Sequence, residues 1–257
     1  MFLLRRFLPA ALIVSALPVA ADEVGVPKKK DDRYPAGDPA QQDAEAALKG
    51  FSVAPGLQVE VWASEPLLAN PVALTFDNDG RAYVAETHRR RSSVPDIRKY
   101  EAWTLENLAL RSVDQRIAYL KGKFPETART APTKDRPDLN QDGQFDWRDL
   151  EIESEKIKLI EDSNRDGKAD QSRVLAEGFN SLATGVGAGI TVHNGDVFYT
   201  CTPDLWKVRA DGTREKLFSG FGVHVAYSGH DMHGAKIGPD GKLYWSIADC
   251  GAHVVDK

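Results

Sequence analysis

Cysteine is scarce in this sequence and basic residues do not outnumber acidic ones, so several classes of function are excluded. Only Cys201 and Cys250 occur in 257 residues, which is too few for a small disulfide-rich scaffold. The sequence has no C-x-x-C-H pattern, the motif for covalent haem attachment. Its 33 Lys and Arg against 38 Asp and Glu give a net charge of −5. We therefore expect no basic stripe for binding nucleic acid.

Long apolar runs are also scarce, and the main one lies near the N-terminus. Residues 7–19 are largely apolar, Arg5 and Arg6 precede them, and small residues follow at 19–21. This order is typical of a secretory signal peptide over residues 1–21, which predicts export to the periplasm or the cell exterior. The run is short for a membrane span, so we expect no span after cleavage. An uncleaved N-terminal anchor is the alternative.

The next segment, residues 22–50, is predicted to be a polar tether. It carries a run of three lysines beside two aspartates, and several prolines, a composition that buries little apolar surface. From residue 51 the composition changes, and residues 57–62 alternate apolar and polar side chains as a strand does. We expect one folded domain over residues 51–257.

Three segments of the domain have the pattern of a β-hairpin: residues 71–86, 187–201 and 229–251. Each contains an Asp-Gly or Asn-Gly pair between two apolar runs, because a tight hairpin turn needs residues that accept positive φ. The turn glycines Gly195 and Gly241 lie 46 positions apart. That spacing is close to the roughly 40–50 residues of a four-stranded propeller blade.

The strand pattern predicts an all-β protein of the β-propeller class. Strands near 187–192, 196–201, 204–209 and 213–218 make one compact blade. An earlier blade is interrupted, since its outer strands, near 156–160 and 172–175, follow about seventy residues after Glu86. The final hairpin begins a third blade. About 2.5 blades are therefore expected here, as part of a larger closed propeller, which needs about four to eight blades.

The interruption, residues 87–154, is predicted to be a helical and acidic-loop insertion. Apolar residues recur at helical spacing between 101 and 121, and Ser112 with Gln115 forms a capping-box pattern. One or two short helices are expected there. The insertion either shapes a binding face at one rim of the sheets or only caps their edge.

Two acidic loops, residues 138–146 and 162–170, resemble calcium-binding loops. Both place oxygen-bearing side chains at alternate positions around a glycine, as an EF-hand loop does. Position 12 is Asp149 in the first loop but Arg173 in the second, and the second loop could instead be a solvated hairpin turn. The predicted calcium ligands are Asp138, Asn140, Asp142, Asp146 and Asp149, and in the second loop Asp162, Asn164, Asp166 and Asp170.

The third hairpin carries the candidate functional residues. His230 and His233 enter its first strand, Asp249 leaves its second, and a hairpin places these ends at the same edge. The histidines are either functional or polar rim residues that satisfy backbone groups. His88, beside three arginines, is more typical of a surface residue than of a central channel. Cys201 and Cys250 lie at the ends of two inner strands of neighbouring blades, so they either form a disulfide or pack as small buried thiols.

Several motifs of the domain lie at residues 62–66, 70–74, 83–86, 199–206, 229–234 and 238–241. They resemble the N-terminal propeller of the membrane-bound dehydrogenase family that is abundant in planctomycetes. The resemblance covers residue 51 to the C-terminus. It implies an exported dehydrogenase whose electron-accepting cytochrome domain, if present, lies outside this chain.

His230, the G-P-D-G turn at 238–241 and Asp249 are more distantly similar to a hairpin of the soluble quinoprotein sugar dehydrogenases. Those six-bladed propellers bind pyrroloquinoline quinone (PQQ) and calcium. The resemblance implies that His230 is the general base, that His233 and Asp249 contact the cofactor, and that the substrate is a sugar or alcohol. It departs at Gly234 and Ala235, where those enzymes usually carry Gly-Arg. A non-catalytic scaffold that binds a glycan or a protein is the alternative.

Overall fold

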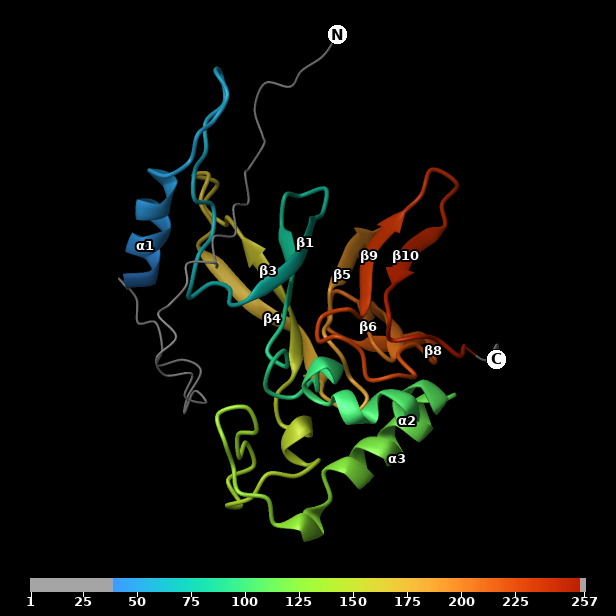
Figure 1. Ribbon diagram of the computed structural model, residues 1–257. Helices are drawn as coiled ribbons and strands as arrows, with labels where there is room; N and C mark the ends of the chain where they lie inside the picture. The colour runs from blue at the N-terminus through green and yellow to red at the C-terminus, as the bar shows by residue number, and fades with distance from the viewer. Residues whose placement is uncertain (1–38, 255–257) are drawn as a thin grey trace.

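The computed structural model describes residues 39–254, and the predicted signal peptide lies outside them. The described part begins with helix α1 (Pro39–Leu48), where the tether was expected to continue. No helix among the described residues is long and apolar enough to cross a membrane. The remaining structure is mostly antiparallel β-sheet (Figure 1), as predicted.

The first sheet contains four strands in the order β1 (Pro71–Phe76), β2 (Ala82–Glu86), β3 (Glu155–Glu161) and β4 (Gln171–Phe179). All neighbours are antiparallel, and β2 pairs with β3 across the whole insertion. The interruption predicted at 87–154 therefore lies between two paired strands of one sheet.

The second sheet repeats this meander without an interruption, as β5 (Gly189–His193), β6 (Asp196–Cys201), β7 (Asp204–Val208) and β8 (Arg214–Ser219). A third unit consists of the hairpin β9 (Met232–Ile237) and β10 (Leu243–Ile247). All three predicted hairpins are confirmed.

The first and third hairpins repeat one detail of turn chemistry. Asp77 accepts backbone hydrogen bonds within the first turn, and the hydroxyl of Tyr83 lies 3.4 Å from its carboxylate. In the third turn Asp240 accepts from the backbone of Lys242, and Tyr244 donates to Asp240 at 2.9 Å. The similarity of sequence between these hairpins is therefore a similarity of contacts.

The three sheets pack face to face in chain order. Tyr83, Ile157 and Leu159 of the first sheet share a core with Val197 and Tyr199 of the second. A second core joins Leu205 of the second sheet to Met232 and Trp245 of the hairpin. First strands β1, β5 and β9 lie side by side. The described sheets do not close into a ring, so the complete propeller stays a prediction.

One predicted strand is wrong. Residues 57–62 form no strand, although their alternation favoured one. This segment instead covers the first sheet: the Trp62 ring packs edge-on against Phe76 with centroids 5.9 Å apart, and the Trp62 carbonyl accepts a hydrogen bond from Ala169.

The insertion folds against the sheets as a small helical layer. Its helices α2 (Thr104–Ala109) and α3 (Val113–Lys123) lie at one end of the sheets (Figure 1). Half of the predicted capping box is present: Ser112 accepts from the backbone of Gln115, but the Gln115 side chain accepts from the backbone of Arg111, one residue before the cap. A stacked aromatic pair, Tyr100 and Trp103, packs against the hydrophobic core of the insertion.

A buried arginine joins the insertion to the sheets. The guanidinium of Arg89 is fully buried and donates only to main-chain carbonyls, those of Ser93, Glu153, Asn180, Ser181 and Thr184. Burial lowers the pKa of Arg89 to about 10, so the side chain remains charged at neutral pH. Glu155, also buried, accepts hydrogen bonds from Thr87 and from the backbone of Arg89 and Gly187.

The pH dependence of stability is expected to report Glu155. Burial raises its pKa to about 7 from the ordinary value of 4.5, although hydrogen bonds from Arg89, Thr87 and Gly187 oppose the shift. The folded protein then binds more protons than the unfolded chain between these values. The free energy of unfolding should therefore fall as the pH rises from about 5 to about 7. Urea denaturation across this range measures the slope, and Glu155→Gln should flatten it; an unchanged slope in that variant would contradict the assignment.

Gly187 is expected to tolerate no side chain. A Cβ atom there would lie 1.7 Å from the hydroxyl of Tyr199, which is fully buried. Gly187→Ala should therefore destabilise the protein by about 1–3 kcal/mol through overpacking. Gly122→Ala in α3 is the matched control, because no atom lies within 4 Å of its added Cβ and alanine favours helix. Chemical denaturation should show a loss for the first variant and none for the second.

Candidate active site at a histidine and aspartate pair

The structure brings His230 and Asp249 together, as the hairpin predicted. Nδ1 of His230 lies 3.2 Å from Oδ1 of Asp249, and both side chains are about half exposed. Within the described residues, Nε2 of His230 has no hydrogen-bond partner. A carboxylate that accepts from Nδ1 fixes the tautomer in which Nε2 carries the lone pair. The pair therefore has the geometry of an oriented base open to solvent.

Tyr227 lies against this pair. Its ring centre is 5.2 Å from that of His230, and its backbone N–H donates to Oδ2 of Asp249 at 3.2 Å. On the insertion side, the guanidinium of Arg98 lies 4.9 Å from the Tyr227 ring centre. The hairpin, the loop before it and the insertion all contribute side chains here.

A cleft of about 410 Å³ opens beside the pair. Asp249 and Tyr227 line one side, and the insertion supplies the opposite wall. The insertion residues that line it are Ile97, Arg98, Glu101, Thr104, Asn107 and Leu108. The insertion thus shapes a concave surface next to His230, which favours the first of its two predicted roles.

Asn107 joins the two walls of the cleft by hydrogen bonds. Its side-chain amide donates to the carbonyl of Val225 at 2.8 Å, and its side-chain oxygen accepts from the N–H of the same residue at 2.8 Å. Asn107 is buried, so both hydrogen bonds are shielded from water. This double contact holds helix α2 against the loop that carries Tyr227.

The other predicted histidines do not join the site. Nε2 of His233 lies 2.9 Å from the carbonyl oxygen of Gly229, a backbone contact that suits the rim interpretation. The surface interpretation of His88 is wrong, because its side chain is only 7% exposed and lies 3.2 Å from the buried Glu86. Burial raises the pKa of Glu86, but contacts with His88, Lys158 and Ala69 outweigh it and leave the pKa below its usual value.

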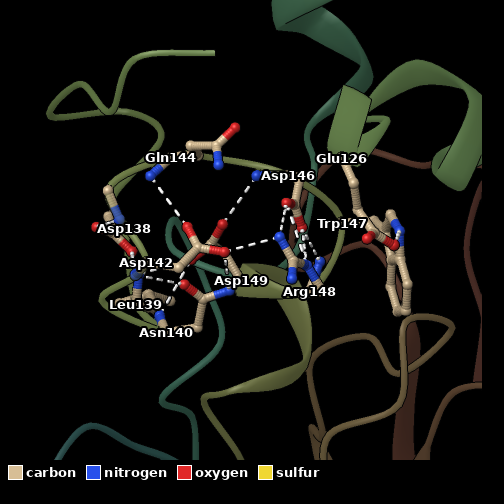
Figure 2. Close-up of polar contacts among 11 residues, drawn as sticks. Glu126, Asp138, Leu139, Asn140, Asp142, Gln144, Asp146, Trp147, Arg148 and Asp149 are labelled. Carbon is tan, nitrogen blue, oxygen red and sulfur yellow. Dashed lines mark hydrogen bonds and ion pairs between the residues drawn. The ribbon is translucent and has the colours of Figure 1, made fainter. Parts of the chain in front are cut away.

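The first acidic loop is closed by hydrogen bonds and an arginine (Figure 2). Asp138 accepts from the backbone of Asp142 and Gly143, and Asp149 accepts from three backbone N–H groups. The guanidinium of Arg148 bridges Asp142 and Asp146 at 2.7 and 2.5 Å. Its hydrogen bond lowers the pKa of Asp146.

The second acidic loop repeats these backbone contacts in a hairpin turn between β3 and β4. Asp162 accepts from the backbone of Asp166 and Gly167, Asn164 accepts from that of Asp166, and Asp170 accepts from Ser163. Across residues 39–254, no three His, Cys, Asp or Glu side chains are grouped so that they could hold a metal ion. Calcium binding by the two loops therefore stays a prediction.

Because hydrogen bonds hold both loops and Arg148 also holds the first, we expect removal of divalent ions with EDTA to leave the melting temperature unchanged. A ligand that binds only the folded state raises the melting temperature with its concentration. Thermal melts in EDTA, in Ca²⁺ and in Mg²⁺ measure this. A melting temperature that rises with Ca²⁺ alone would contradict the expectation and support the calcium sites.

The two cysteines are free and buried, which matches the second of their two predicted roles. Burial raises the pKa of the Cys250 thiol to about 12 and that of Cys201 well above its usual value. Neither thiol is therefore ionised at neutral pH, and neither is a reactive nucleophile.

Sequence reasoning missed Arg98, Tyr227 and Asn107. Their contacts join segments more than a hundred positions apart, and no local pattern marks them. One weak signal existed: Tyr227 stands close before His230, and an exposed aromatic residue near a candidate base is a common feature of binding sites.

Comparison with known proteins places the chain in a family without indicating its activity. No curated protein and no solved structure matches it. A family described as a domain of unknown function, DUF7133, matches residues 43–257, which include every sheet, the insertion and the His230–Asp249 pair. The chain belongs to the DUF7133 family.

Proposed function

We propose that this chain is part of an exported, dehydrogenase-like β-propeller that oxidises a hydroxyl group of a small sugar or alcohol, with a quinone as electron acceptor. The observation that carries the proposal is the His230–Asp249 pair at the edge of the cleft. An oriented imidazole with one free nitrogen suits the removal of a proton from a hydroxyl group.

The proposed reaction is a two-electron oxidation. Nε2 of His230 takes the hydroxyl proton while the carbinol carbon loses hydride to the quinone, so that a C=O bond forms and the C–H bond breaks. The reduced quinone takes up a proton and leaves as the hydroquinone. The imidazolium, which Asp249 stabilises, then returns its proton to solvent.

The residues around the cleft do not fit PQQ as a tightly held cofactor. PQQ is a tricarboxylate, whereas the cleft is lined by the carboxylates of Glu101 and Asp249. Its one arginine, Arg98, is already paired with Asp96. We therefore treat the quinone as a second substrate and assign it no binding residues.

The same misfit favours a second candidate, an exported propeller scaffold that binds a glycan or a protein without chemistry. Dye-linked oxidation of a panel of sugars and alcohols, with added quinone, distinguishes the two. The proposal expects substrate-dependent dye reduction by the chain. Ligand binding in the cleft without any dye reduction would favour the scaffold.

A further inference from the structure

We propose that Arg98 and Tyr227 are positioning residues for His230, which makes the insertion a working part of the site. The proposal rests on His230 acting as the base. The guanidinium of Arg98 lies over the Tyr227 ring, and the Tyr227 ring lies beside the His230 imidazole. The three side chains form one continuous row of contacts, called the stack below, that begins in the insertion and ends at His230, with the Tyr227 and His230 rings tilted by 54° to each other.

The insertion end of the stack is held by Asp96. Nε of Arg98 donates to Asp96 Oδ1 at 2.9 Å, and the backbone N–H of Arg98 donates to the same oxygen at 3.0 Å. Asp96 also caps the short helix Ile97–Lys99 that carries Arg98. These hydrogen bonds hold the pKa of Asp96 below its usual range, so the pair stays ionised. A guanidinium held in this way loses little further freedom when it stacks on a ring.

The other end of the stack is held by Asp249. One carboxylate oxygen faces Nδ1 of His230, and the other accepts from the backbone of Tyr227. Asp249 therefore ties the imidazole to the main chain of the residue whose ring lies beside it. Tyr227 is 41% exposed. Without Arg98, its ring would lose the contact on its insertion side.

The charged groups near His230 differ in whether they contact its imidazole. Asp249 contacts it directly, Arg98 and Asp96 lie beyond Tyr227, and the Arg90 side chain approaches Gly229. Substitutions of Arg98 can therefore separate the effect of its contact with the Tyr227 ring from the effect of its charge. Arg98→Lys keeps the charge and a cation–ring contact, whereas Arg98→Met keeps only the length of the side chain.

The test combines histidine NMR with kinetics on the full chain. Arg98→Met and Tyr227→Leu should move the His230 ring resonances toward those of free histidine, because the neighbouring ring is displaced. They should lower kcat about ten- to a hundred-fold, since small misplacement of a catalytic group is costly; KM does not decide the test, because both side chains also line the cleft. Arg98→Lys should restore much of the wild-type spectrum and rate. Lys99→Met is the control, because Lys99 pairs with Asp135, away from the stack.

Unchanged His230 resonances in Arg98→Met and Tyr227→Leu would overturn the proposal, whatever the rates are. Moved resonances with an unchanged kcat would also overturn it, since the stack would then be structural only. If wild-type protein shows no turnover, the proposed function fails, while moved resonances still support the positioning of His230 by the insertion. Melting temperatures close to wild type are expected, because the Arg98 side chain is 57% exposed.

Discussion

His230→Ala is expected to lower turnover by about two to four orders of magnitude, the usual contribution of general acid–base catalysis. The fold should be unaffected, because the imidazole is 54% exposed and its side-chain contacts are with Asp249 and the Tyr227 ring. Steady-state rates and melting temperatures, measured on the same preparations, test both parts of this expectation.

His233→Ala is the matched control for that variant. His233 lies three residues further along the chain, and its ring contacts the carbonyl of Gly229. Its replacement should change turnover much less and lower stability by about 1 kcal/mol, the worth of an ordinary hydrogen bond. Full turnover in His230→Ala combined with a lower melting temperature would mean that His230 is a structural rim residue.

Arg89→Met is expected to have the largest effect on stability. It removes the donor to five main-chain carbonyl groups and the positive charge that favours the ionised form of the buried Glu155. Removing one of two buried opposite charges costs about 3–5 kcal/mol. Urea denaturation measures the change in the free energy of unfolding.

Arg90→Met provides the matched control, because Arg90 is the next residue and is exposed. It removes the same charge from almost the same place in the sequence. A surface change of this kind is usually within about 0.5 kcal/mol of wild type. Equal effects of the two substitutions would show that the buried contacts of Arg89 do not support the fold.

Much of the fold could be predicted because its signals are local. Asp-Gly and Asn-Gly turns between alternating runs marked three hairpins, and the structure has all three. The insertion was found because it interrupts a repeat. The His230–Asp249 contact followed from hairpin geometry alone, since the ends of two paired strands must meet at one edge.

The remaining features depend on tertiary contacts that leave no local pattern. Residues 57–62 alternate like a strand, but no strand pairs with them, and Trp62 packs on Phe76 instead. Arg89 and Arg90 look alike in the sequence, yet only Arg89 is buried. The cleft itself needs the insertion to fold back on the loop near Val225 through Asn107, which only a structure reveals.

Histidine-detected NMR of the chain, titrated with a hydroxyl substrate identified in the dye-linked assay, tests whether the substrate binds in the cleft beside His230. The chain has six histidines, and three of them report on separate places. His230 is the proposed general base, His224 lines the cleft, and His193 ends strand β5. We expect saturable shifts of His230 and His224, with His193 unchanged. Shifts confined to the other histidines, with His230 and His224 unmoved at saturation, would contradict it.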